Sequence, residues 1–146
     1  MPYKDATSTY KETKVKTAGQ GQLIVMLYDE AVKQLAKAIE ISEKNQSEKD
    51  PGKIELISKA VMKTEEIITE LMVSLDFDQG GEISKNLFSL YTWFNRELLE
   101  ANISQDIQRM KEVKNMLSEL RNTWNAISKM TVEQPNRGSV GLNIAG

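Results

Sequence analysis

The sequence predicts an all-α protein, an antiparallel up-down-up-down four-helix bundle with a short N-terminal segment and a flexible C-terminal tail. Apolar residues recur every three or four positions over four long stretches, polar or turn-forming residues separate these stretches, and no stretch alternates with the period of a strand. The expected parts are an N-terminal segment at residues 1–18, a bundle at 19–130 with helices at about 20–42, 51–75, 82–102 and 105–130, and a tail at 131–146.

The first long helix has a wide apolar arc. One side of it holds Leu23, Ile24, Leu27, Ala31, Leu35 and Ala38, and a neighbouring side holds Val25, Tyr28, Val32, Ala36 and Ile39. A helix at a protein surface needs only one apolar stripe, so this arc predicts either central burial or a second surface kept for a partner. Thr17 and Gln20 have the spacing of a capping box, which predicts a helix start near Gln20. The N-terminal segment before it is expected to be either a short helix or disordered.

The turns between the helices are marked by specific residues. Glu43 to Asp50 is expected to be a loop, and the Asp50-Pro51 pair predicts a sharp start of the second helix. Gly80-Gly81 predicts a break before the third helix, with Phe77 tucked inward as a plug. Ser104 is the expected N-cap of the fourth helix, and the short turn before it makes the third and fourth helices antiparallel neighbours.

The third helix carries a second wide arc, because Phe88, Tyr91 and Leu98 lie beside its main apolar seam. Tyr28 and Tyr91 fit two placements. A buried tyrosine needs a hydrogen-bond partner for its hydroxyl, so this residue suits a binding surface that is apolar on one side and wet on the other, as well as a core. Both placements are open from the sequence.

Composition excludes several function classes. The chain has 146 residues, no Cys and no His, which removes thiol chemistry, thiolate metal sites and the commonest general base. The net charge is -2 with both signs interspersed, which argues against binding of nucleic acid. No apolar run approaches the roughly 20 residues of a membrane span and no secretory signal is evident, so a cytoplasmic protein without a cofactor, a bound metal or enzymatic activity is expected.

Motifs spread over most of the chain support a more specific prediction. They are Met26-Leu27-Tyr28-Asp29, Leu75-Asp76 followed by Gly80-Gly81, and Ala101-Asn102, together with Tyr10, Leu87, Tyr91 and Trp124. With these residues the chain resembles the flagellar secretion chaperone FliS family. It departs from the family at Glu30, where members usually have Gly, and at Gly19-Gln20, where Ser-Pro is common.

The resemblance implies a bundle that holds the disordered C-terminal segment of flagellin along apolar grooves, prevents its premature polymerisation and supports its delivery to the flagellar type III export apparatus. The export gate is a further expected partner, and the protein is expected to be a monomer or weak oligomer. Residues 3–15 are expected to form a lid that flagellin displaces. The alternative is a helical adaptor or scaffold that self-associates through its spare apolar surface. The candidate flagellin-binding residues are Tyr10, Leu27, Tyr28, Leu87 and Tyr91.

Overall fold

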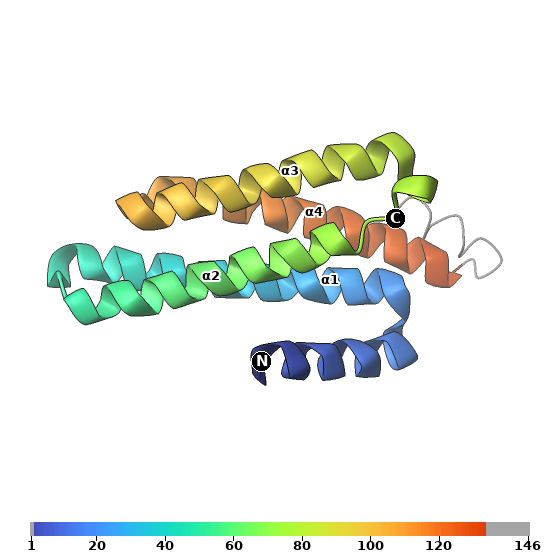
Figure 1. Cartoon of the computed structure of the whole chain (residues 1–146), viewed down its shortest axis with the longest axis horizontal. Coiled ribbons are helices and arrows are strands. Elements are labelled where there is room, and N and C mark those ends of the chain that lie inside the picture. The colour runs from blue at the N-terminus through green and yellow to red at the C-terminus, as the bar shows by residue number, and fades with distance from the viewer. Residues whose placement is uncertain (1, 134–146) are drawn as a thin grey trace.

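The computed structural model describes the backbone of residues 2–133 and the side chains of residues 20–130. It contains four helices, which are α1 (Pro2–Glu48), α2 (Pro51–Val73), α3 (Phe77–Ser104) and α4 (Ile107–Glu133). Figure 1 shows them side by side with alternating chain direction. The predicted all-α, up-down-up-down bundle is confirmed.

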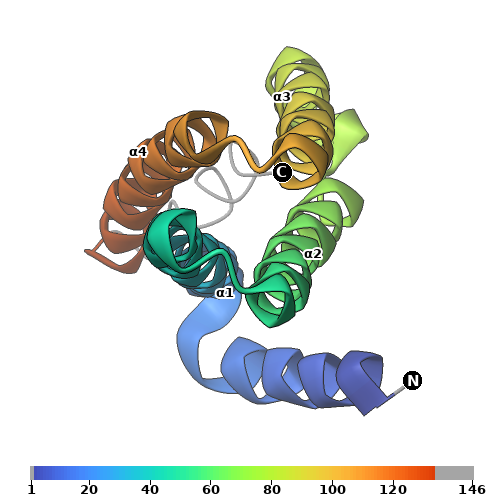
Figure 2. The ribbon, with the colours of Figure 1, turned by 90° about the vertical axis from the view of Figure 1, so that its left-hand side faces the viewer.

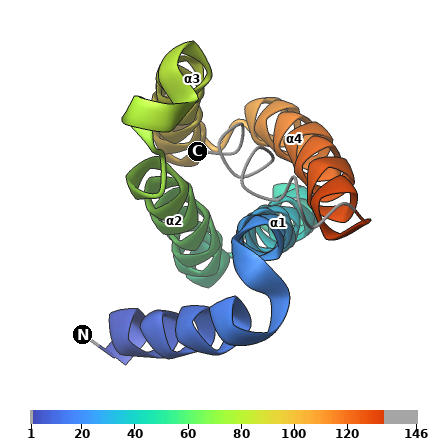
Figure 3. The ribbon, with the colours of Figure 1, turned by 90° about the vertical axis from the view of Figure 1, so that its right-hand side faces the viewer.

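The helices stand at the corners of a square when the bundle is viewed along its length (Figure 2). α1 contacts α2 and α4, and α3 contacts the same two helices, so α1 and α3 lie on one diagonal. The view from the opposite end shows the same order (Figure 3). In all three views the first turns of α1 fold back along the side of α1 and α2 that faces away from α3 and α4.

α1 is longer than the sequence pattern indicated. It starts at Pro2, so the predicted helix start near Gln20 is wrong. Residues 43–48 continue the helix instead of forming a loop, because they are polar but include no Gly or Pro to interrupt it. The turn between α1 and α2 consists of Lys49 and Asp50 only, and the Asn45 side chain makes two hydrogen bonds to its backbone. The Asp50 N–H donates to Asn45 Oδ1 at 2.8 Å, and Asn45 Nδ2 donates to the Asp50 carbonyl at 3.2 Å.

The predicted start of α2 is confirmed, since Gly52 N–H donates to Asp50 Oδ1 at 2.9 Å. α3 starts five residues earlier than predicted because Asp76 Oδ1 accepts from the N–H groups of Asp78 and Gln79. The break predicted at Gly80-Gly81 is present as a kink inside α3. It lies at Gly81, whose φ of 51° favours glycine. The prediction that Phe77 tucks inward is wrong, because this side chain is 47% exposed.

The capping residue of α4 also differs from the prediction. Ser104 is the last residue of α3, where its hydroxyl donates to the Glu100 carbonyl at 2.9 Å, so its assignment as N-cap was wrong. Asp106 caps α4 by accepting from the Arg109 N–H at 3.2 Å. The predicted antiparallel turn is confirmed. α4 extends to Glu133, and the remainder of the expected tail lies outside the described residues.

The core is centred on α1. Leu35, Ala31 and Ala38 have no exposed surface, and Val25 and Ile39 on the neighbouring side are buried as well. Between the two explanations of the wide arc, the structure therefore supports central burial over the described part of α1. The largest wholly buried side chains come from all four helices and include Tyr28, Ile57, Ile68, Tyr91, Phe94, Leu98, Met110 and Leu117.

Candidate functional site

A pair of buried tyrosines joins the two diagonal helices at the centre of the bundle. The hydroxyl oxygens of Tyr28 on α1 and Tyr91 on α3 lie 2.5 Å apart, and either hydroxyl can be the donor. The two rings are tilted by 54° with centroids 6.5 Å apart. Their side chains are 0% and 1% exposed. Each buried tyrosine hydroxyl therefore has the other tyrosine hydroxyl as a hydrogen-bond partner.

Burial changes the acidity of both phenols. It raises the pKa of Tyr91 to about 12, and the hydrogen bond from Tyr28 lowers this value in part. Burial also raises the pKa of Tyr28, and the nearby Tyr91 raises it further, while a hydrogen bond with Trp124 acts in the opposite direction. Both phenols are neutral near pH 7, so the pair is a structural hydrogen bond and carries no charge to offer a ligand.

The five predicted contact residues do not form one open site. Leu27, Tyr28 and Tyr91 are core residues, and Leu87 is half-buried against the same core. Tyr10 lies in the first part of α1, and its side chain is outside the described residues. The structure thus brings Tyr28 and Tyr91 together, but inside the bundle. Whether these residues contact flagellin stays a prediction.

Apart from Met130 of α4, the large apolar side chains that are more than one third exposed within residues 20–130 belong to α2 and α3. We call the surface formed by six of these side chains the α2/α3 face. Phe77 and Phe88 meet edge to face within it, with ring centroids 5.9 Å apart. The six residues are Met62, Val73, Phe77, Phe88, Leu99 and Ile103.

Two hydrogen bonds between α2 and α3 locate four of these residues on one face. Ser58 Oγ donates to Asn102 Oδ1 at 3.2 Å, and Asn95 Nδ2 donates to Thr69 Oγ1 at 3.3 Å. Residues three, four or seven positions away lie on the same side of a helix. Met62 and Val73 are four positions from Ser58 and Thr69, Leu99 is four from Asn95, and Phe88 is seven from Asn95. These side chains therefore follow the junction of the two helices.

The sequence pattern indicates part of this face. The pattern predicts Phe88 as apolar surface beside the seam of the third helix, but it carries no such prediction for Met62, Leu99 or Ile103. Each stands outside the regular seam of its helix, which is the pattern of an apolar residue without a partner helix. A search for large apolar residues off the seam would have found the face.

The surfaces involving α4 are different in character, because ion pairs cross them. Arg109 of α4 holds Glu97 and Glu100 of α3, with shortest distances of 3.2 and 2.8 Å. Arg121 pairs with Asp29 of α1 at 2.7 Å. The two side-chain hydrogen bonds between α2 and α3 are neutral, so a partner with apolar side chains meets less competing charge there.

A cavity of about 440 Å³ lies where the α1–α2 and α3–α4 turns meet. Ser42, Asn45, Ile54, Gln105 and Ile107 contribute to its wall.

Residues 2–133 contain no helix with the length and apolar content that crossing a bilayer requires. Among residues 20–130, whose side chains the structure describes, no three His, Cys, Asp or Glu side chains are grouped so that they could hold a metal ion.

A helical bundle with a sizeable exposed apolar face has the features of a protein-binding module. Comparison with known families gives a specific assignment, since residues 3–131 match the family described as flagellar protein FliS. The chain belongs to the FliS family. Its place there assigns it a role as an export chaperone for a flagellar protein partner.

Individual relatives are similar over nearly their full length. The flagellar secretion chaperone FliS of Salmonella typhimurium is 36% identical over 127 residues, which cover 86% of this chain and 89% of that protein. The protein of the same description from Escherichia coli is 31% identical, covering 85% and 88%. FliSB of Pseudomonas aeruginosa, also described as a flagellar secretion chaperone, is 36% identical, covering 80% and 87%.

Proposed function

We propose that this chain binds the C-terminal segment of flagellin in the cytoplasm, prevents its premature polymerisation and supports its delivery to the flagellar type III export apparatus. The α2/α3 face is the observation that carries this proposal. It offers apolar side chains along much of the length of two antiparallel helices, which suits an extended or helical segment better than a compact domain. No enzymatic activity is part of the proposal.

A guest that is disordered when free fits this arrangement. Its ordering consumes part of the interaction energy, roughly 2 to 5 kcal/mol, and this leaves a complex that can be released for export. Covering the apolar side of the segment would also keep it from pairing with other flagellin molecules. The export gate, as a second partner, would act on the chaperone while the guest is bound.

The residues predicted from the sequence have two different parts in this proposal. Leu87 is half-buried on α3, the helix that supplies most of the α2/α3 face, and it can contribute part of its surface directly. Leu27, Tyr28 and Tyr91 would touch a guest only if helices separate, since all three are buried in the structure. Tyr10 belongs to the proposed lid at residues 3–15.

The direct test is purification of the chain with flagellin, both intact and without its C-terminal segment. We expect a stable complex with the intact protein and none with the truncated protein. Equal recovery of both flagellins would disprove the assignment of the C-terminal segment.

A pair of variants tests whether the α2/α3 face is the binding surface. Leu99 and Ile83 are both exposed on α3, and their separation of sixteen positions places them about 160° apart around the helix. Leu99→Ser should weaken binding of a flagellin C-terminal peptide by roughly tenfold, since about 1 to 2 kcal/mol of apolar burial is lost. Ile83→Ser should have little effect. Equal effects would move the site elsewhere.

The same face could instead join two copies of the chain, as in the adaptor alternative. We propose that the protein is a monomer or weak oligomer, which sedimentation over a range of concentrations measures directly. A stable dimer that Leu99→Ser dissociates and that flagellin does not change would favour the adaptor.

A further inference from the structure

The α2/α3 face contains one acidic residue with an unusual position. Glu65 is three positions from Met62 and four from Thr69, so it lies on the side of α2 that meets α3. The residue is half-buried. None of the ion pairs formed within residues 20–130 includes it. A partly desolvated carboxylate without a cation is costly for the free protein.

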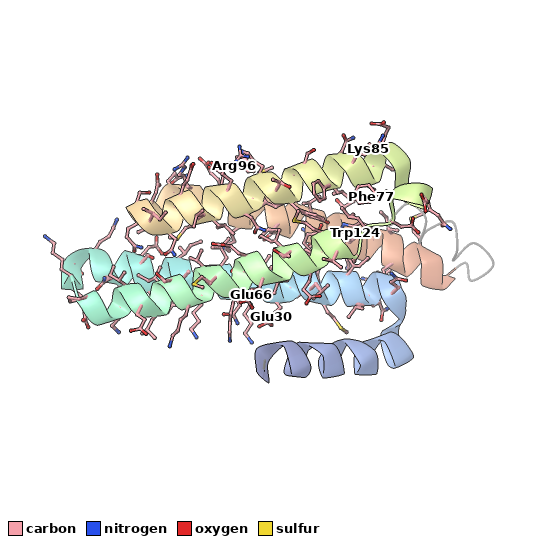
Figure 4. The ribbon with its side chains drawn as sticks, viewed as in Figure 1. Glu30, Glu66, Phe77, Lys85, Arg96 and Trp124 are labelled. Carbon is pink, nitrogen blue, oxygen red and sulfur yellow. The ribbon has the colours of Figure 1, made fainter. Side chains whose placement is uncertain are left out.

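The acidity of Glu65 agrees with this position. Burial raises the pKa of its carboxyl, and the adjacent Glu66 carboxylate raises it further. Glu66 itself is exposed. Figure 4 shows Glu66 beneath α2 and Arg96 on the opposite edge of α3, so neither of these charges lies between the two helices.

Asn95 on α3 is a second acceptor without a donor at the same junction. Its Oδ1 atom is buried and has no hydrogen-bond partner, while its Nδ2 donates to Thr69 Oγ1. The same Thr69 hydroxyl donates to the backbone carbonyl of Glu65 at 2.9 Å. Thr69 thus bonds to the Asn95 side chain and to the backbone of Glu65, which places Asn95 beside the turn of α2 that carries Glu65.

We propose that Glu65, beside Asn95 at the α2–α3 junction, is a specificity site that accepts a Lys or Arg side chain of the guest segment bound on the α2/α3 face. This inference rests on the proposed binding of flagellin. A cation is the ligand that this half-buried carboxylate lacks, because an ammonium or guanidinium group has several donors and no acceptor. The flanking apolar residues Met62 and Leu99 suit the methylene stem of such a side chain.

The site would set the position of the guest as well as its affinity. Contacts between apolar side chains tolerate sliding of an extended segment, whereas one buried pair of opposite charges fixes a single register. A guest without a basic residue at the matching position would leave the carboxylate covered and unpaired, so the site discriminates against it.

The test compares Glu65→Gln with Glu66→Gln, which removes the same charge one residue away at an exposed position. Binding of a flagellin C-terminal peptide is measured by calorimetry at low and high salt, with thermal unfolding of each variant as a check on folding. Glu65→Gln should weaken binding by about 10- to 100-fold, as expected for a charge-assisted hydrogen bond, and should reduce its salt dependence. Glu66→Gln should change the affinity less than about twofold.

A second set of peptides, in which each Lys or Arg is replaced singly by Gln, identifies the partner. One of these peptides should bind the wild-type chain more weakly than the unchanged peptide does. The same peptide and the unchanged peptide should bind the Glu65→Gln variant with similar affinity, because the partner of the replaced residue is already absent. If Glu65→Gln binds every peptide as the wild type does, the specificity site is disproved while flagellin binding stands. If the wild-type chain binds no flagellin peptide and no intact flagellin, the proposed function fails and this inference fails with it.

Discussion

α1 and α3 both have wide apolar arcs, yet the bundle uses them in opposite ways. The arc of α1 is covered by its neighbours, so that Leu35 has no exposed surface. The arc of α3 is divided, with Tyr91 and Phe94 in the core and Phe88 and Leu99 exposed. The width of an apolar arc therefore does not by itself separate a central helix from a binding helix.

Side-chain size separates the two cases. α1 has Ala31 and Ala38 on its buried side, and small residues allow neighbouring helices to approach closely. At Gly21 a Cβ atom would lie only 3.3 Å from Ser128 Oγ of α4, which shows how near these helices come. α3 has Phe88, Leu99 and Ile103 beyond its seam, and these leave bulky apolar surface that no helix covers.

The largest expected difference between the two regions is in stability. Leu35→Ala should lower the free energy of unfolding by about 2 to 5 kcal/mol, because it leaves a cavity in the centre of the bundle. Leu99→Ala should lower it by less than about 1 kcal/mol, because this side chain is 52% exposed. Urea denaturation followed by circular dichroism measures both values. Similar losses for the two variants would show that the α2/α3 face is part of the core.

The tyrosine pair sharpens the comparison, since it is where α1 and α3 meet. Tyr28→Phe should cost about 1 to 3 kcal/mol of unfolding free energy, because the buried Tyr91 hydroxyl loses its partner. The double variant Tyr28→Phe with Tyr91→Phe should cost less than the sum of the single variants. Strict additivity in urea denaturation would mean that the two hydroxyls do not interact in solution.

Alkaline pH should weaken the same contact. The pKa of Tyr91 is about 12 in the folded protein, compared with about 10 for an unfolded tyrosine. Above pH 10 the unfolded chain loses a proton that the folded chain keeps, so stability falls as pH rises. The loss should reach roughly 1 kcal/mol at pH 11. Unfolding of the wild type and of Tyr91→Phe between pH 8 and about 11 measures it, and identical slopes would contradict the assignment.

The smallest expected effect concerns Ser42, which is buried on α1 with a hydroxyl that has no partner within the described residues. Ser42→Ala should change the unfolding free energy by less than about 0.5 kcal/mol or increase it slightly, because no hydrogen bond is lost. Thermal unfolding by calorimetry is sensitive enough to measure this. A loss above 1 kcal/mol would show that the hydroxyl has a partner in solution.

The fold could be predicted because it depends on periodicity. Seam positions such as Ile68, Phe94 and Leu117 recur at helical spacing and are buried as expected. Helix ends were less predictable, because a cap depends on local backbone geometry that several residues can satisfy. Asp76 rather than a residue after the glycines starts α3, and Asp106 rather than Ser104 caps α4.

The candidate site was only partly predictable for a different reason. Tyr28 and Tyr91 were recognised as notable, but their hydrogen bond joins residues 63 positions apart on diagonal helices. Such a pair is determined by the bundle's axial alignment, which no local pattern encodes. Glu65 also looks like any other solvated helix residue until α3 is placed beside it.

The diagonal tyrosine contact has a mechanical consequence for the bundle. A slip of α1 past α3 by one helical turn is a movement of about 5.4 Å, and it would strand both phenolic hydroxyls in an apolar interior. The contact therefore fixes the axial alignment of α1 and α3, whose described backbones are not in contact. With the scaffold held in one alignment, the conformational entropy lost on complex formation comes from the arriving segment rather than from the helices that receive it.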